Sequence, residues 1–130
     1  MGILYVFLGG GAGSVCRYVL GKFIADSLPT RFPLGTFCVN CLGCLAIGFI
    51  TAAFGRIQAS PGTRLLLATG FLGGFTTFST FNLESVLLLR ESDYSSAILN
   101  IVLSLALGLL CVAAGMLIAG AVAGKGPYPR

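Results

Sequence analysis

The chain alternates long apolar stretches with short groups of charged residues. Three windows of 24, 19 and 31 residues, at positions 32–55, 65–83 and 94–124, contain no charged side chain. A helix needs roughly 20 predominantly apolar residues to cross a bilayer, so each window can span a membrane. Residues 3–25 are equally apolar and form a fourth candidate, although they carry Arg17 and Lys22. We therefore predict an all-α integral membrane fold, a single domain over residues 1–130 with spans at about 3–25, 33–55, 63–89 and 95–121.

Composition supports a membrane protein. Hydrophobic residues make up 56% of the chain and charged residues 9%, and the mean hydropathy is +0.97, whereas about 25% of a typical soluble domain is charged. A cleaved signal peptide is an alternative for the first stretch. No basic residue precedes Ile3, however, and Arg17 stands where a cleavage site would lie. Four spans joined by short links leave no soluble domain, so the chain must act inside the membrane.

The charged residues give little bias in orientation. The net charge is +4, but the basic residues are scattered over every connection and form no patch for nucleic acid. We interpret them as interfacial anchors, four on the face that holds both termini (Arg56, Arg64, Lys125, Arg130) and three on the other (Lys22, Arg31, Arg90). Because the distribution of Lys and Arg normally sets orientation, this chain is expected to insert both ways.

Small residues four positions apart recur along the spans. Such pairs let helices approach closely in lipid. Four helices of this size enclose little space, and a dimer is the smallest assembly expected to form a pathway. The pairs are Gly9 with Gly13, Cys44 with Gly48, Gly70 with Gly74, Ser104 with Gly108, and Gly120 with Gly124.

A C-x-x-C-x-x-C run at positions 38–44 raises the alternative of a zinc or iron–sulfur site. These three cysteines lie in an apolar span, the chain has no histidine, and no fourth ligand follows at a useful spacing. We interpret them as small helix-packing residues.

The third predicted span has an unusual centre. Over residues 69–82, a glycine pair is followed by hydroxyl and β-branched side chains, whose helix propensity is poor. We predict a break between Gly73 and Thr77, with freed backbone groups that form a candidate ion site. The alternative is that hydroxyls bond back to carbonyls one turn earlier while the helix continues.

Polar side chains also follow helical faces within the spans. Thr77, Phe81 and Glu84 fall at i, i+4 and i+7, and a second stripe joins Asn100, Ser104 and Gly108. Such stripes suit a path for water or ions.

Two further polar residues, Asn40 and Arg17, lie within the second and first spans. Polar and charged groups in a membrane are costly and indicate function. The alternatives are a structural hydrogen bond between helices for Asn40 and an arginine that extends to the interface.

Three motifs in order resemble the CrcB/Fluc family of fluoride channels. They are the glycine run at 10–13 leading to Arg17 and Tyr18, the segment 33–36 leading to Asn40 and Gly43, and residues 70–81. The resemblance covers essentially the whole chain.

This resemblance implies an antiparallel, dual-topology homodimer in the inner or plasma membrane of a prokaryote. Two narrow pores would export fluoride passively. A structural sodium ion would lie at the dimer centre, held by the backbone carbonyls of Gly73 and Thr76 from both subunits.

The resemblance also implies roles for individual side chains. Phe78 and Phe81 would present ring edges to the pores, where the aromatic quadrupole is positive. Arg17 and Glu84 would lie in a vestibule. The remaining pore-lining residues are expected to be Asn40, Thr77, Ser79, Thr80, Ser104 and Asn100. In the family, hydroxyl groups including a tyrosine line the track on the fourth helix, so Asn100 and Gly108 depart from its pattern and leave the role of this helix open.

Three rival functions are possible for a chain of this kind. A small dual-topology multidrug exporter needs a carboxylate in its first helix, where this chain has Arg17. A fluoride/proton carrier would have to use Glu84, the single acid within the predicted spans. A membrane scaffold would leave the polar residues unexplained. Hydrolytic or redox chemistry has no suitable residues, so an enzyme is not expected.

Overall fold

The computed structural model describes residues 1–122, and this part of the chain consists of helices and their connections, without a strand. The expectations for Gly124, Lys125 and Arg130 lie outside the described residues. Three helices are long and apolar enough to cross a membrane: α1 (Gly2–Ser27), α2 (Leu34–Ile57) and α6 (Tyr94–Val122). Their bounds agree with three of the predicted spans to within a few residues.

The segment predicted as the third span is interrupted. It begins with α3 (Pro61–Arg64), continues through the π-helical turn η1 (Leu65–Leu72) and α4 (Gly73–Phe75), and resumes as α5 (Phe78–Arg90). Thr76 and Thr77 between them are extended, with φ/ψ of −83°/155° and −146°/116°. The predicted break is therefore confirmed, and the alternative of a continuous helix is wrong.

The break begins later than the glycine pair suggested. Gly73 and Gly74 are both helical, and the backbone extends only at the two threonines. Extended conformation suits β-branched residues. The Thr76 hydroxyl still donates to the Leu72 carbonyl at 2.9 Å, which is the backward hydrogen bond foreseen for a continuous helix.

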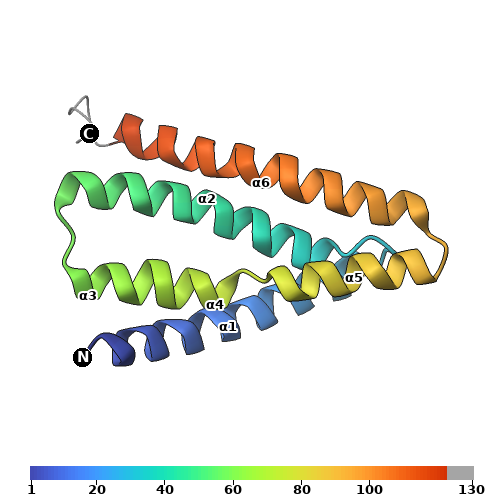
Figure 1. Ribbon diagram of the computed structural model, residues 1–130, viewed down its shortest axis with the longest axis horizontal. Coiled ribbons are helices and arrows are strands. Elements are labelled where there is room, and N and C mark those ends of the chain that lie inside the picture. The colour runs from blue at the N-terminus through green and yellow to red at the C-terminus, as the bar shows by residue number, and fades with distance from the viewer. Residues whose placement is uncertain (123–130) are drawn as a thin grey trace.

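The helices run along one long axis in alternating directions (Figure 1). The start of α1, the connection between α2 and α3, and the end of α6 lie at one end of the molecule. The connections between α1 and α2 and between α5 and α6 lie at the other. This arrangement agrees with the predicted placement of Arg56 and Arg64 beside the N-terminus.

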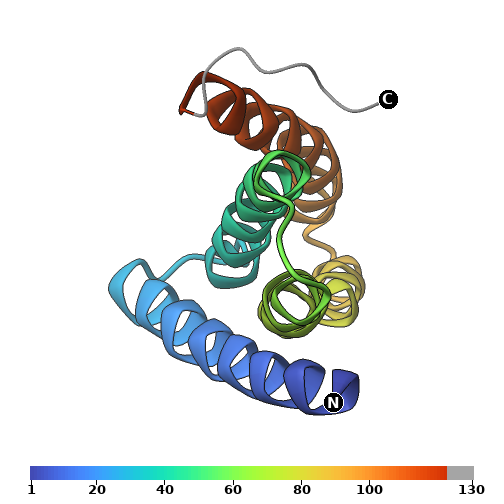
Figure 2. The ribbon, with the colours of Figure 1, turned by 90° about the vertical axis from the view of Figure 1, so that its left-hand side faces the viewer.

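The most extensive contacts between helices are those of α2 with α6 and those of α1 with η1 and α4. Figure 2 shows α2 between α6 on one side and α1 on the other. A Cβ atom at Gly13 would overlap the carbonyl oxygen of Phe71, and one at Gly48 would overlap that of Val112. The small-residue spacing therefore does serve close helix packing at these positions.

The interior is small and the surface is apolar. Val39, Leu72 and Phe75 form the buried cluster. Large side chains such as Phe7 and Leu109 lie on the outside, 73% and 74% exposed. A surface this apolar is unfavourable in water and favourable against lipid or another protein.

The cysteines of α2 contribute to the contact with α6. Cys41 and Cys44 lie beside Cys111. Within residues 1–122, no group of three or more His, Cys, Asp and Glu side chains is arranged to hold a metal ion.

Candidate functional site

The helix break is held by one side chain of α2. The Asn40 Nδ2 donates to the Thr77 carbonyl at 3.0 Å, and the Thr77 N–H donates to the Asn40 Oδ1 at 2.8 Å. A single amide thus satisfies both the donor and the acceptor of the extended residue. Such groups cannot be left unpaired in an apolar medium, so Asn40 makes this backbone conformation possible.

A second set of contacts comes from α1. The Arg17 Nε donates to the Gly74 carbonyl at 3.0 Å, and the Ser14 hydroxyl lies 3.5 Å from the same oxygen. That carbonyl would otherwise accept from Phe78, whose N–H is displaced by the break. Arg17 is therefore held beside the break and does not extend to the end of its helix.

The start of α5 is capped locally. The Thr77 Oγ1 accepts from the Thr80 N–H at 3.2 Å and donates to the Thr80 Oγ1 at 3.0 Å. Threonine is a favourable residue at this capping position because its oxygen accepts from an amide without an intrahelical partner.

Some backbone carbonyls at the break accept no hydrogen bond from a side chain or from another element. In the part of the chain that the structure describes, the carbonyl oxygens of Gly73, Phe75 and Thr76 accept no hydrogen bond outside their helices. Carbonyl oxygens of this kind can coordinate a hard cation.

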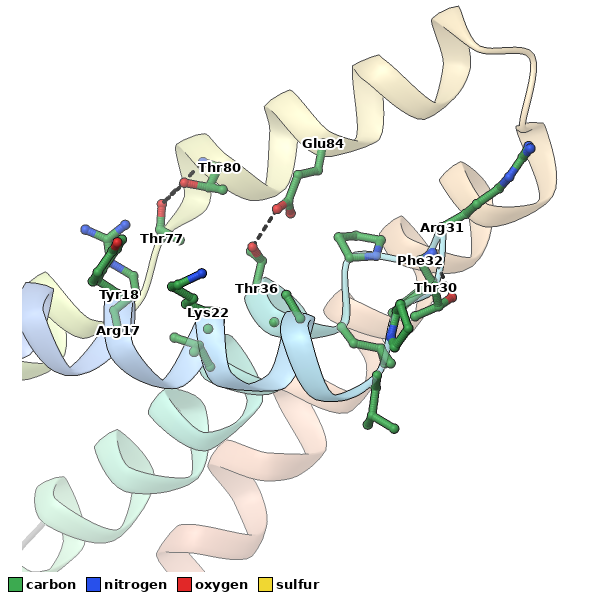
Figure 3. Close-up of a pocket in the computed structure, with 18 residues that line it drawn as sticks. Arg17, Tyr18, Lys22, Thr30, Arg31, Phe32, Thr36, Thr77, Thr80 and Glu84 are labelled. Carbon is green, nitrogen blue, oxygen red and sulfur yellow. Dashed lines mark hydrogen bonds between the residues drawn. The ribbon is translucent and has the colours of Figure 1, made fainter.

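A pocket of about 800 Å³ opens between α1, α2 and α5 (Figure 3). Arg17, Lys22 and Arg31 supply positive charge to its lining, and Glu84 supplies the one acid. The Thr36 Oγ1 donates to the Glu84 Oε1 at 2.7 Å. Arg17 and Glu84, expected in a vestibule, thus line one cationic pocket.

A second pocket, of about 410 Å³, lies on the other side of the break. Its lining carries no charged side chain, and its polar groups come from Asn40, Thr76, Thr77 and Ser104. Thr77 lines both pockets, so both border the broken segment.

The two phenylalanines predicted to line a pore both border the second pocket. Their ring centroids are 5.8 Å apart. Phe78 is 74% exposed on the surface of the chain, whereas Phe81 is 8% exposed.

Two predicted pore residues border neither pocket. Ser79 is exposed, with its hydroxyl 3.3 Å from the Thr77 Oγ1. Asn100 is buried between α5 and α6, where its Nδ2 donates to the Ser85 Oγ at 3.0 Å. Sequence reasoning missed this use of Ser85 and the contact of Thr36 with Glu84, because both partners lie far apart along the chain.

Together, the apolar helices define a multi-pass membrane protein in which polar groups gather around one helix break. Residues 4–116 match the family described as CrcB-like protein, Camphor Resistance (CrcB), and the chain belongs to this family. The resemblance found in the sequence is thereby confirmed.

Three relatives, each named fluoride-specific ion channel FluC, match over nearly their whole length. The relative from Phocaeicola vulgatus is 47% identical over 114 residues, 88% of this chain and 94% of its own. The relative from Hydrogenobaculum sp. is 46% identical over 121 residues, 92% and 98% of the two chains. The relative from Maridesulfovibrio salexigens is 43% identical over 114 residues, 87% and 90%.

Proposed function

We propose that this protein is a fluoride-selective channel that lets fluoride leave the cytoplasm passively. The observation that carries this proposal is a cationic pocket and an uncharged pocket bordered by phenylalanine rings, both lined by Thr77 of the broken segment, in a chain whose relatives are named fluoride channels. A channel catalyses no reaction, in agreement with the absence of a catalytic motif from the sequence.

The charge distribution supports a path for an anion. Arg17 and Arg31 raise the local anion concentration in the first pocket, whereas the charge of Lys22 is offset by its ion pair with Asp26 at 2.9 Å. Beyond Thr77 the second pocket offers the second N–H of the Asn40 amide and aromatic ring edges in place of cations. Its hydroxyl groups, on Thr76, Thr77 and Ser104, donate to protein oxygens in this structure and would have to turn to reach an anion. Neutral donors bind an anion without trapping it, which conduction requires. The residues proposed to contact fluoride are Asn40, Thr77, Phe78, Ser79, Thr80, Phe81 and Ser104.

We further propose that the working unit is a dual-topology homodimer. Phe78 and Gly73 are exposed on one chain, and a Cβ atom added at Gly73 meets no neighbour. An antiparallel second copy would cover this apolar surface and bring two breaks together. The nearly even distribution of basic residues permits both orientations.

We also propose that a sodium ion is bound at the dimer centre, between the helix breaks of the two subunits. The carbonyls of Gly73 and Thr76 accept no hydrogen bond from the described residues outside their helices, and oxygen ligands suit a hard cation. Contributed by both subunits, these carbonyls would hold the ion, which would offset their partial charges and join the two chains.

The cellular membrane is inferred from the relatives, which come from bacteria. We place the protein in the plasma membrane, or in the inner membrane where there are two.

The test is ion efflux from liposomes that contain the purified protein. We expect rapid fluoride efflux and chloride efflux close to that of protein-free liposomes. Chloride efflux as fast as fluoride efflux would contradict the proposal. Accumulation of fluoride against its own gradient, driven by a proton gradient, would instead indicate a carrier that uses Glu84.

A further inference from the structure

A buried hydrogen-bond relay joins α6 to α5 beside the second pocket. Asn100 and Ser85 border neither pocket, although the Ser104 hydroxyl, which lines the second pocket, donates to the Asn100 Oδ1 at 3.4 Å. The Asn100 Nδ2 donates to the Ser85 Oγ at 3.0 Å, and the Ser85 hydroxyl donates to the Phe81 carbonyl at 2.8 Å. Asn100 is 1% exposed and Ser85 is 5% exposed, and they are the buried polar side chains of residues 1–122. A buried polar pair in an apolar setting is retained only when its bonds are made.

The position of α5 depends on contacts of this kind. The two threonines separate α5 from α4, so no continuous helix fixes its rotation or height. Its most extensive contact is with α6. Phe81, Ser85 and Leu88 form its buried face. Asn100 donates its hydrogen bond to Ser85, which lies on this face one turn after Phe81.

We propose that Asn100 and Ser85 are positioning residues that set where Phe81 stands in the ion path, without touching the ion. This inference rests on the proposed function as a fluoride channel. A hydrogen bond fixes the rotation of a helix more closely than apolar contact does, because it has a preferred direction as well as a distance. Asn100 would therefore act through α5, although it lies in the stripe expected to line the pore.

The experiment is a double-mutant cycle on fluoride efflux per folded channel, with S85A, N100L and the double variant. If both residues act through their shared bond, each single variant and the double variant lose a similar amount of flux, roughly tenfold. Losses that multiply in the double variant would overturn the proposal, because they would mean that Asn100 acts independently of Ser85, through Ser104 or on the ion itself.

Two further variants separate positioning from general stability. S85T keeps the hydroxyl group and should restore most of the flux lost in S85A. L88A removes packing from the same buried face and breaks no side-chain hydrogen bond, so it should lower thermal stability while flux per folded channel stays near that of the natural protein. Failure of S85T to restore flux, or an equal loss of flux per folded channel in L88A, would overturn the proposal.

The unaltered protein distinguishes this inference from the proposed function. If it shows no fluoride-selective efflux, the function is wrong and with it the inference. If it conducts fluoride and both single variants conduct equally well, only the inference is wrong. Should N100L fail to fold, the comparison of S85A with S85T still decides the outcome.

Discussion

At the scale of single residues, the two phenylalanines beside the break differ in environment. Phe78 lies on the surface of the chain, and Phe81 lies on the buried face of α5. Substitution of Phe81 is therefore expected to affect packing within the chain. Substitution of Phe78 is expected to affect mainly the contact with the proposed second subunit.

We predict that F78I and F81I both reduce fluoride flux by roughly tenfold or more, because isoleucine keeps apolar volume and removes the positive ring edge. F81I should also lose about 1 kcal/mol of stability, as expected for a buried apolar substitution of similar volume. Efflux per dimer and size-exclusion chromatography measure the two effects separately.

Phe7 provides the matched control, since it is 73% exposed on α1 and borders neither pocket. F7I should leave flux unchanged. Normal flux per dimer in both F78I and F81I would exclude these two rings from the ion path.

At the scale of elements, the packing of α1 on η1 and α4 holds Arg17 beside the break. Gly13 lies at this contact, and its missing side chain allows the helices to approach.

We predict that G13A destabilises the protein by about 1–3 kcal/mol, because its methyl group would overlap the Phe71 carbonyl and force the helices apart. G11A is the control on the same helix, since a Cβ atom there meets nothing within 4 Å. It should be neutral or slightly stabilising, given the better helix propensity of alanine. Thermal unfolding in detergent distinguishes the two, and equal midpoints would contradict the assigned contact.

The start of α6 carries a pH-dependent contribution to stability. The Asp93 Oδ1 accepts from the Ser96 N–H at 3.1 Å. Hydrogen bonds from the backbone and side chain of Ser96 lower the pKa of Asp93 below its ordinary value. A lowered pKa means that folding is favoured while the carboxylate is charged, above its unfolded pKa of about 3.9.

We therefore predict that stability falls as the pH drops through about 4 and below, and that D93N lacks this part of the decrease because its amide does not titrate. The measurement is the difference in unfolding midpoint between the natural protein and D93N from neutral to acidic pH. The other carboxyl groups titrate in both proteins, so their contributions cancel in this difference. A difference that does not change with pH would contradict the capping role.

At the scale of the whole molecule, dual topology predicts that one end of the chain faces both sides of the membrane. Gln58 is exposed in the connection between α2 and α3. We predict that Q58C, in a background lacking the five native cysteines, is labelled in part by a membrane-impermeant thiol reagent on sealed cells. The remainder should react only after permeabilisation. Labelling from a single side would contradict dual topology.

The sodium proposal makes a separate prediction about the dimer. Replacing sodium with a large organic cation should lower the dissociation temperature of the dimer, since a ligand bound only to the assembled state stabilises it by mass action. T76V keeps the backbone carbonyl and should retain this dependence. Two results together would contradict the sodium proposal. They are a dimer that is equally stable without sodium, and an experimental structure that shows no ion between the two breaks.

The sequence by itself determined the membrane character of the chain, the bounds of its helices and the existence of the break. These are local properties: uncharged windows of sufficient length, glycines at packing spacing, and a run of residues that are poor in helices. The motifs shared with the CrcB family were equally visible, because a motif is a pattern of neighbours.

Only the tertiary structure decided which polar groups meet. The break lies at Thr76 and Thr77 because Asn40, from another helix, can satisfy the extended backbone there. Glu84 accepts a hydrogen bond from Thr36, 48 positions away in the sequence. Asn100 is buried against Ser85, although its spacing along the helix predicted a position lining the pore. The physical reason is the same in each case. Burial strongly favours polar groups that find a partner, but the partner is chosen by the crossing of helices, which no local pattern encodes.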